Sequence, residues 1–252
     1  MKLVDRSAIV TGAGAGIGEA YAHALAAQGA SVVVADIEAE AAEAVAKQLV
    51  AQGGAAIAVR ADVTSETDVE ALADEALAAH GRIDILVNNA GLASVEASAP
   101  CATMERSLWR RLLDVNVTGA LNCAVACRPS LAQSDAGVII NQSSVAAYMG
   151  TPSAYGVSKL ALNGLTAALA AEFAADGIRV NGIAPSTMES ATRPAMRAFP
   201  EEMRQAFLQQ QLIRRFGRME ELAELLVFLC SDQSRFVTGQ TWLFDGGLVR
   251  RP

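Results

Sequence analysis

The octapeptide TGAGAGIG at residues 11–18 is the strongest indication of the fold in this sequence. It follows the apolar run of residues 7–11, which predicts a strand, and opens an alanine-rich segment that predicts a helix. Glycines in such a turn let the backbone approach a pyrophosphate and leave helix N–H groups directed at negative charge. The spacing is G-x-x-x-G-x-G at Gly12, Gly16 and Gly18, because Ile17 stands where a G-x-G-x-x-G pattern has its last glycine. Taken alone, the turn also suits a tight connection without a ligand.

The rest of the chain alternates short β-branched runs with longer stretches rich in alanine and leucine. The short runs predict strands over residues 7–11, 31–35, 56–61, 83–88, 137–142, 178–182 and 241–244. The longer stretches predict helices over residues 18–28, 38–52, 65–79, 104–133, 153–175 and 220–230. Repeated β-α-β units require parallel strands with right-handed crossovers. We therefore predict an α/β fold, a Rossmann-type doubly wound parallel sheet of about seven strands flanked by helices.

The chain shows no internal boundary between domains. No low-complexity linker, repeat or charge run divides residues 1–252, so we expect a single dinucleotide-binding and catalytic domain. Residues 185–215 are irregular, contain three prolines and follow the carboxyl end of a predicted strand. Because α/β sheets bind ligands at that edge, we expect this segment to be a substrate-binding lid. An ordinary surface excursion is the alternative.

Composition narrows the partners. The chain has 20 Lys and Arg against 27 Asp and Glu, a net charge of −7, so nucleic acid and anionic membranes are poor partners. No export signal or membrane-spanning stretch is visible in the sequence. Four scattered cysteines and two histidines favour neither disulfides nor a metal site. We expect a cytoplasmic protein that acts on a small molecule and binds no metal.

An acidic residue ends the second predicted strand. Asp36 lies 20 residues beyond Gly16, the offset at which a carboxylate binds the adenosine ribose of a dinucleotide. A phosphate on that ribose would meet like charge, and no Lys or Arg stands at the neighbouring positions. The sequence therefore predicts NAD(H) rather than NADP(H) as the cofactor. A helix-capping role for Asp36 is compatible with this one.

A second motif, YGVSK at residues 155–159, starts a predicted helix. Residues four apart share one helix face, so the Lys159 ammonium should lie beside the Tyr155 phenol. Bringing a tyrosine from a pKa of about 10 to near 7 takes about 4 kcal/mol. A charge about 4 Å away at an effective dielectric near 20 supplies energy of that order. We therefore expect Lys159, helped by the positive charge of an oxidised nicotinamide, to lower the pKa of Tyr155 and make it a proton acceptor. By itself, Y-x-x-x-K is a common helix pattern.

Over nearly its whole length the sequence resembles the classical short-chain dehydrogenases/reductases. The ordered motifs that carry the resemblance are TGAGAGIG at residues 11–18, Asp62-Val63, NNAG at 88–91, Asn116 within LLDVNVTGAL, Ser144 in NQSS, YGVSK at 155–159 and NGIAP at 181–185. The resemblance implies an enzyme that interconverts a secondary alcohol and a ketone. It implies a catalytic tetrad of Asn116, Ser144, Tyr155 and Lys159, and usually a homotetramer.

The resemblance and the two motifs together give a set of expected site residues. Those expected to bind NAD(H) are Gly12, Ala15, Gly16, Ile17, Gly18, Asp36, Ile37, Asp62, Val63, Asn89, Ala90, Gly91, Tyr155, Lys159, Pro185, Met188 and Ser190. Those expected to line the substrate pocket are Ser144, Val145, Tyr148, Met149 and Met188, with Leu92, Phe199 and Phe207 as further candidates. This wall is mostly apolar, which favours a hydrophobic or cyclic alcohol.

The implied chemistry divides the work between cofactor and side chains. Tyr155 would take the alcohol proton while the nicotinamide accepts hydride, and Ser144 would bind the substrate oxygen. Lys159 would also grip the nicotinamide ribose, and Asn116 would hold a water that links Lys159 to solvent. Ser143, rather than Ser144, is the alternative catalytic hydroxyl. The alternative for Asn116 is a structural role, as a polar side chain within a helix whose hydrogen bonds are all made inside the protein.

Two positions depart from the family pattern, and two other functions remain open. Ser144 and Tyr155 are only 11 residues apart, and Ser186 stands where the family usually has glycine. One alternative function is a 3-oxoacyl-thioester reductase of the same family, and the other is a noncatalytic NAD-binding regulatory protein. The apolar stretch of residues 242–248 is a candidate for an oligomer interface. The sequence specifies neither the substrate nor the physiological direction.

Overall fold

The computed structural model describes residues 1–93, 96–189 and 201–250, and it has a seven-stranded parallel sheet at its centre. The strands run in the order β3 (Ala56–Arg60), β2 (Ser31–Asp36), β1 (Ser7–Thr11), β4 (Ile85–Asn88), β5 (Val138–Gln142), β6 (Arg179–Pro185) and β9 (Thr241–Phe244). The predicted α/β fold with a doubly wound parallel sheet is confirmed.

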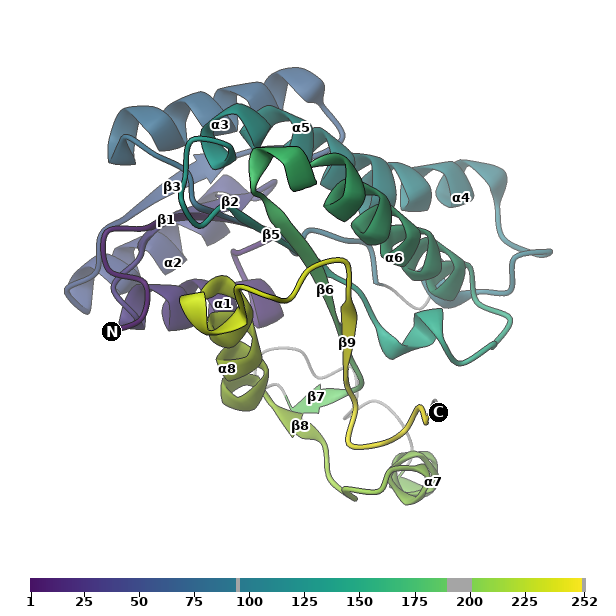
Figure 1. The fold of residues 1–252 in the computed structure, drawn as a ribbon. Coiled ribbons are helices and arrows are strands. Elements are labelled where there is room, and N and C mark those ends of the chain that lie inside the picture. The colour runs from purple at the N-terminus through teal and green to yellow at the C-terminus, as the bar shows by residue number, and fades with distance from the viewer. Residues whose placement is uncertain (94–95, 190–200, 251–252) are drawn as a thin grey trace.

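Helices cover both faces of the sheet (Figure 1). One face carries α1 (Gly16–Ala27), α2 (Ala39–Ala51) and α8 (Met219–Cys230), whose apolar side chains share a core with every second residue of the strands. The other face carries α3 (Glu66–His80), α5 (Gly119–Leu131) and α6 (Ala154–Glu172). Because both faces are covered, β1, β4 and β5 are buried throughout, as their apolar sequences require.

One predicted helix is broken into three parts. Residues 104–133 form α4 (Arg106–Leu113), a π-helical turn at Asp114–Thr118, and α5. The prediction of one continuous helix over this range is therefore wrong. The π turn contains Asn116, whose amide hydrogen-bonds to backbone outside the helix, and such turns often occur at functional sites.

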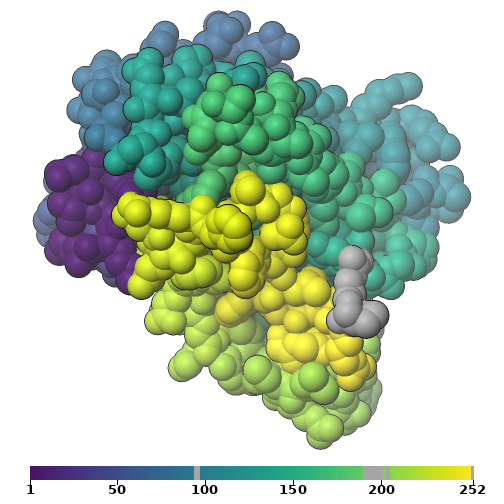
Figure 2. Space-filling model, in the orientation of Figure 1, coloured from purple at the N-terminus to yellow at the C-terminus, as the bar shows by residue number. Residues whose placement is uncertain are grey.

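Between β6 and α8 the structure describes residues 186–189 and 201–218, which contain one helix and two short strands. Residues 188–189 (β7) and 217–218 (β8) form a two-stranded sheet, and α7 (Glu201–Gln210) lies between them in sequence. After α8 the chain returns to the sheet through β9, and Figure 2 shows this C-terminal segment, in yellow, at the surface beside α7 and α8. In the described part of the chain, no helix combines the length and apolarity needed to cross a membrane.

The sheet brings the predicted site residues to one edge. In a parallel sheet all carboxyl ends lie on the same side, and the chain leaves β1 and β4 toward opposite faces. A crevice forms where neighbouring strands diverge in this way. The turn after β1, Asp36 at the end of β2, the residues after β4 and those after β5 therefore meet there.

Candidate active site

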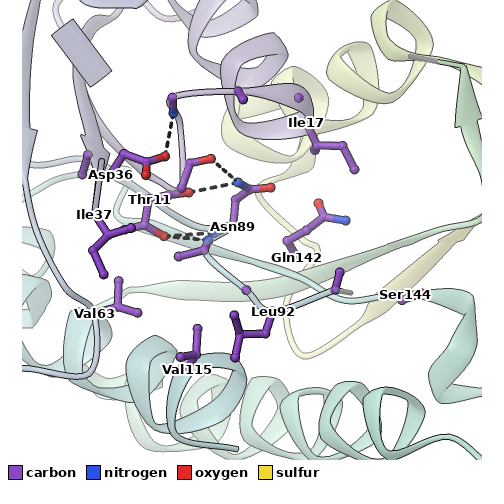
Figure 3. A pocket seen from close by; sticks show the side chains of 18 of the residues that line it. Thr11, Ile17, Asp36, Ile37, Val63, Asn89, Leu92, Val115, Gln142 and Ser144 are labelled. Atoms are coloured by element: carbon purple, nitrogen blue, oxygen red, sulfur yellow. Dashed lines mark hydrogen bonds between the residues drawn. The ribbon is translucent and has the colours of Figure 1, made fainter. Parts of the chain in front are cut away.

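A cavity of about 650 Å³ lies along the carboxyl edge of the sheet (Figure 3). It runs from the loop after β2, past the turn after β1, to the ends of β5 and β6. Asp36 and Ile37 mark one end, while Ser144, Tyr155 and Lys159 mark the other. A volume of this size is typical of sites for cofactors and their substrates.

The Gly-rich turn has no room for side chains at its key glycines. Gly12 has a φ of +62°, and a Cβ built on it would lie 2.8 Å from the Cα of Ala90. A Cβ on Gly18 would lie 2.2 Å from the carbonyl oxygen of Gly12. The turn can therefore close tightly only because these residues are glycines, and it leaves the start of α1 open to the cavity.

Asp36 braces this turn from the next strand. Its Oδ2 accepts a hydrogen bond of 2.8 Å from the Gly14 N–H, and its Oδ1 accepts one of 3.1 Å from Glu38. Each carboxylate oxygen has a further lone pair, so both can still accept from the hydroxyls of a ribose. The carboxylate also places negative charge at this end of the cavity, and that charge would repel the additional phosphate of NADP(H) on a ribose bound there.

The NNAG stretch holds the other side of the turn. The Asn89 amide donates to the carbonyl oxygens of Thr11 and Gly12 at 3.0 and 2.9 Å. The Thr11 hydroxyl oxygen accepts from the N–H groups of Asn89 and Ala90, both at 3.1 Å (Figure 3). These bonds tie the ends of β1 and β4 together, which gives the floor of the cavity a fixed shape.

Asn116 is buried behind the cavity rather than lining it. Its Oδ1 accepts from the Leu92 N–H at 2.7 Å, and its Nδ2 donates to the Leu92 carbonyl at 3.2 Å and to the Ser158 hydroxyl at 3.0 Å. The side chain is 1% exposed. Asn116 therefore holds the loop after β4 against the helix that carries Tyr155 and Lys159.

The two serines of the NQSS stretch point to different places. The Ser143 hydroxyl donates to Asn163 Oδ1 of α6 at 2.6 Å, which engages it within the protein. The Ser144 hydroxyl forms a hydrogen bond with Tyr155 and accepts from the Ala146 N–H. Of the two, Ser144 is the one whose hydroxyl meets the phenol.

Tyr155 and Lys159 lie together on the first turns of α6. The Lys159 Nζ lies 5.7 Å from the centre of the Tyr155 ring and donates to the Gln142 carbonyl at 2.7 Å. Burial raises the pKa of Tyr155 above its ordinary value, and the Ser144 hydrogen bond partly offsets this. Burial also lowers the pKa of Lys159 to about 8.

These directions correct one expectation from the sequence. From the sequence we expected an ammonium about 4 Å from the phenol, where its electric field would lower the pKa of Tyr155. In the structure both groups have left water, which disfavours the phenolate and the ammonium alike. Within the protein alone, the pKa of Tyr155 is therefore raised rather than lowered.

Most of the predicted site residues meet in this one cavity. The expected cofactor-binding residues that line it are Gly12, Ala15, Gly16, Ile17, Asp36, Ile37, Asp62, Val63, Asn89, Ala90, Gly91, Tyr155, Lys159, Pro185 and Met188. Gly18 lies behind the turn, and Ser190 falls outside the described residues. Ser186 also lines the cavity, and its N–H donates to the Phe244 carbonyl without a positive φ.

The predicted substrate wall is only partly seen. Ser144 and Met188 line the cavity, whereas Val145, Tyr148 and Met149 are not among its described lining residues. Leu92 does line it, and Phe199 lies outside the described residues. Between Ser144 and Tyr155 the chain forms a short 3-10 turn at Val145–Ala147 and then passes through Gly150, which has a φ of +63°.

The sequence did not point to several residues that line the cavity, chiefly Gln142, Arg111, Val115 and Met219. Arg111 and Val115 are four residues apart, so on a helix they share one face. That spacing is the only feature of the sequence that groups these two residues. Gln142 is the last residue of β5, where a polar side chain after an apolar strand marks the ligand-binding edge. Among the described residues, no cluster of three or more His, Cys, Asp or Glu side chains suits a metal ion.

Known proteins match this chain over nearly its full length. The profile of the enoyl-(acyl carrier protein) reductase family matches residues 12–249. Cis-4-hydroxycyclohexanecarboxylate dehydrogenase of Sinomonas cyclohexanicum is 40% identical over 96% of each chain. The 3-oxoacyl-[acyl-carrier-protein] reductase FabG of Thermotoga maritima is 34% identical over 99% of this chain and 100% of its own.

The solved structures include the same type of fold with ligands bound. A 7α-hydroxysteroid dehydrogenase in complex with NADH and 7-oxo glycochenodeoxycholic acid superposes with a TM-score of 0.91. It is 38% identical, and the match covers 99% of this chain and 96% of that one. Together with the ordered motifs and the cavity they line, these matches show that the chain belongs to the family of short-chain dehydrogenases/reductases.

Proposed function

We propose that this protein is an NAD(H)-dependent oxidoreductase that interconverts a secondary alcohol and a ketone. The observation that carries the proposal is the shared cavity, which has Asp36 and the Gly-rich turn at one end and Ser144, Tyr155 and Lys159 at the other. A dinucleotide bound along this cavity would have its adenosine end near the Asp36 carboxylate and its nicotinamide end near the Tyr155 phenol.

The residues present fit such a cofactor. A Cβ on Gly14 would lie 2.7 Å from Ala41, and one on Gly91 would lie 3.1 Å from Asn116 Oδ1, so the backbone comes close along the whole floor. The N-terminus of α1 faces the cavity and suits a pyrophosphate. We assign the adenosine ribose to Asp36, the adenine surroundings to Asp62 and Val63, and the nicotinamide ribose to Lys159.

Two side chains, Tyr155 and Ser144, act directly on the substrate. In oxidation Tyr155 takes the proton of the substrate hydroxyl while the carbinol C–H bond breaks and the carbonyl forms. The Ser144 hydroxyl binds the substrate oxygen and stabilises the charge that develops on it. The oxidised nicotinamide, when bound, accepts the hydride and adds a positive charge to the site.

That positive charge acts against the effect of burial on Tyr155. The phenolate is disfavoured in the protein alone, and a nearby cation favours it. Lys159 is held by the Gln142 carbonyl in a fixed position beside the ring. The Asn116 side-chain amide already bonds to Leu92 and Ser158. The expected water that Asn116 would hold to pass protons from Lys159 to solvent therefore stays a prediction.

A cyclic, largely apolar alcohol suits the site best. The substrate end of the cavity combines Leu92, Ala93 and Met188 with few charged groups. The related dehydrogenases named above act on a hydroxycyclohexane carboxylate and on a hydroxysteroid, both cyclic secondary alcohols. We propose the same chemical class here. We also propose residues 185–215 as the substrate-binding lid, of which residues 190–200 lie outside the described residues.

The alternative is reduction of a 3-oxoacyl thioester. The similarity to FabG supports it, while the carboxylate at Asp36 favours NAD(H) over NADP(H). A noncatalytic role is disfavoured because the tetrad residues are all retained and gathered.

We also propose that the chain acts as one domain and as a homotetramer. Large apolar side chains are exposed on α5 and α6, with Val125 56% and Leu160 55% exposed, and Trp242 of β9 is 37% exposed. A cytoplasmic location stays a prediction from the sequence.

A substrate panel tests the proposed function. The purified protein with NAD⁺ is expected to oxidise cyclic secondary alcohols such as cyclohexanols and hydroxysteroids, followed by the absorbance of NADH. Activity found only with small charged hydroxy acids, or only with 3-oxoacyl thioesters and NADPH, would contradict it.

A further inference from the structure

A buried polar pair joins α1 to the end of β5. The Tyr21 hydroxyl donates to the Gln142 Oε1 at 2.7 Å, and the two residues are 1% and 6% exposed. Around them the core of this face is made of apolar side chains. A lone polar pair in such surroundings is costly to bury unless both partners are satisfied.

The orientation of the Gln142 amide is fixed by two contacts. Its Nε2 donates to the Ser143 carbonyl at 3.2 Å, while its Oε1 accepts from Tyr21. Turning the amide over would set Oε1 against the Ser143 carbonyl, so that two acceptors would face each other. Nε2 has two N–H groups, and within the described part of the chain only the one to Ser143 has an acceptor.

Gln142 lies at the reaction end of the cavity. It lines the cavity together with Ile17, Ser144 and Tyr155, and Figure 3 shows its amide between Ile17 and Ser144, away from Asp36. Hydride transfer requires reacting atoms about 3–3.5 Å apart, so the nicotinamide must lie beside the substrate oxygen held by Ser144 and Tyr155. Gln142 is therefore a neighbour of the nicotinamide rather than of the adenosine.

We propose that Gln142 is a positioning residue whose second side-chain N–H donates to the carboxamide oxygen of the nicotinamide. Tyr21 acts through it by holding the amide in the orientation that makes this N–H available. This inference rests on the proposed function, since it requires NAD(H) in the cavity. It adds a buried contact that orients the ring for hydride transfer.

Binding of NADH and of ADP-ribose to Gln142→Met tests the inference. ADP-ribose lacks the carboxamide, and methionine keeps the length of the side chain without its N–H. Losing one hydrogen bond is expected to raise the Kd for NADH about threefold to tenfold. The Kd for ADP-ribose, measured by calorimetry, is expected to stay within about twofold, because none of its atoms contacts the amide N–H.

Two further variants separate the roles of the pair. Tyr21→Phe is expected to raise the Kd for NADH by a smaller factor than Gln142→Met does. In the Gln142→Met background it is expected to have no further effect on this Kd. Gln142→Glu keeps the shape of the side chain and replaces the N–H donor with an acceptor. It is therefore expected to raise the Kd for NADH at least as much as Gln142→Met does. It also serves if the methionine variant does not fold.

A matched control removes a buried hydrogen bond elsewhere. Thr166→Val breaks the 2.9 Å bond between the Thr166 hydroxyl and Asn141, which lies on the opposite face of the sheet from Tyr21. It is expected to lower thermal stability and leave the ratio of the two Kd values unchanged.

The outcomes distinguish this inference from the proposed function. If the ratio of the Kd for NADH to the Kd for ADP-ribose is the same in both Gln142 variants as in the wild type, this inference is overturned and the proposed function stands. A wild-type protein that binds neither ligand would overturn the proposed function and this inference with it.

Discussion

Lys159 is a buried amine of the site, and burying its charged form lowers the stability of the fold. Burial lowers its pKa from 10.5 to about 8, so between these values the unfolded chain binds more protons than the folded one. The free energy of unfolding contributed by Lys159 therefore rises with pH across this window. Below pH 8 the folded protein carries the full cost of burying the ammonium.

A methionine at this position tests that cost. Relative to Lys159→Met, the wild type is expected to gain about 2 kcal/mol of unfolding free energy between pH 7 and 9.5, measured by urea denaturation. Lys47→Met, at an exposed lysine, is the control and should show no such trend. A constant difference between wild type and Lys159→Met over this range would contradict the lowered pKa.

Tyr155→Phe removes only the hydroxyl that is proposed to take the substrate proton. We expect kcat to fall at least about a hundredfold, the usual contribution of a general base. The Kd for NADH, measured by fluorescence, should change little. Because burial raises the Tyr155 pKa, oxidation by the wild type should still increase with pH through the alkaline range. Residual oxidation near the wild-type rate would assign the proton transfer to another group.

Asp36→Asn removes the charge at the adenosine end and keeps an acceptor for the Gly14 N–H. Repulsion of a ribose phosphate falls, so the preference for NADH over NADPH is expected to drop about tenfold or more. The measurement is the ratio of kcat/KM for the two cofactors, with Glu40→Gln, an exposed acid of α2, as the control. An unchanged ratio would place the selectivity elsewhere.

At this scale the sequence predicts the residues whose partners are close in the chain or at a fixed offset. Tyr155 and Lys159 are four residues apart on one helix, and Asp36 ends β2 at the expected distance from Gly16. The Gln142 contact was not predicted because its partner, Tyr21, is 121 residues away. The raised pKa of Tyr155 also depends on burial, which only the folded chain reveals.

The turn and helix that follow β1 act as one element. Gly18→Ala would place a Cβ 2.2 Å from the Gly12 carbonyl oxygen, so the turn must open and its alignment toward the cofactor is lost. We expect NADH binding to weaken at least about tenfold and thermal stability to fall by several degrees.

Gly164→Ala is the control for this change. Gly164 lies within α6, and a Cβ there meets no atom within 4 Å. Alanine should raise the unfolding free energy by about 0.5–1 kcal/mol through its higher helix propensity, without changing NADH binding. Equal NADH affinity in both variants would show that the turn tolerates a side chain.

The sequence pattern predicts the strands of the main sheet but not every element boundary. All seven strands of the main sheet were predicted, since each is an apolar run bounded by turns or helices. The break at Asp114–Thr118 was not, because the π turn is stabilised by Asn116 bonding to Leu92 and Ser158 in other segments. The two-residue strands β7 and β8 are too short for any periodicity to mark them.

For the whole molecule, large apolar side chains are exposed on two helices of one layer. The layer of α3, α5 and α6 exposes Val125 and Leu160, which are 56% and 55% exposed although large and apolar. Both helices pack their other faces on the same side of the sheet. Exposed apolar side chains on neighbouring elements of one layer are typical of a surface that another chain covers, and the proposed tetramer supplies a second copy.

The double variant Val125→Glu with Leu160→Glu tests this arrangement. Two carboxylates on each copy would be buried against like charge, so the tetramer is expected to dissociate into smaller species. Light scattering coupled to size exclusion should show the mass of four 26.2 kDa chains for the wild type and a lower mass for the variant. Val50→Glu, at a 54% exposed position of α2 in the other layer, is the matched control and should keep the wild-type mass. A variant that keeps the full mass would place the contacts between copies elsewhere, with the exposed Trp242 of β9 as the next position to change.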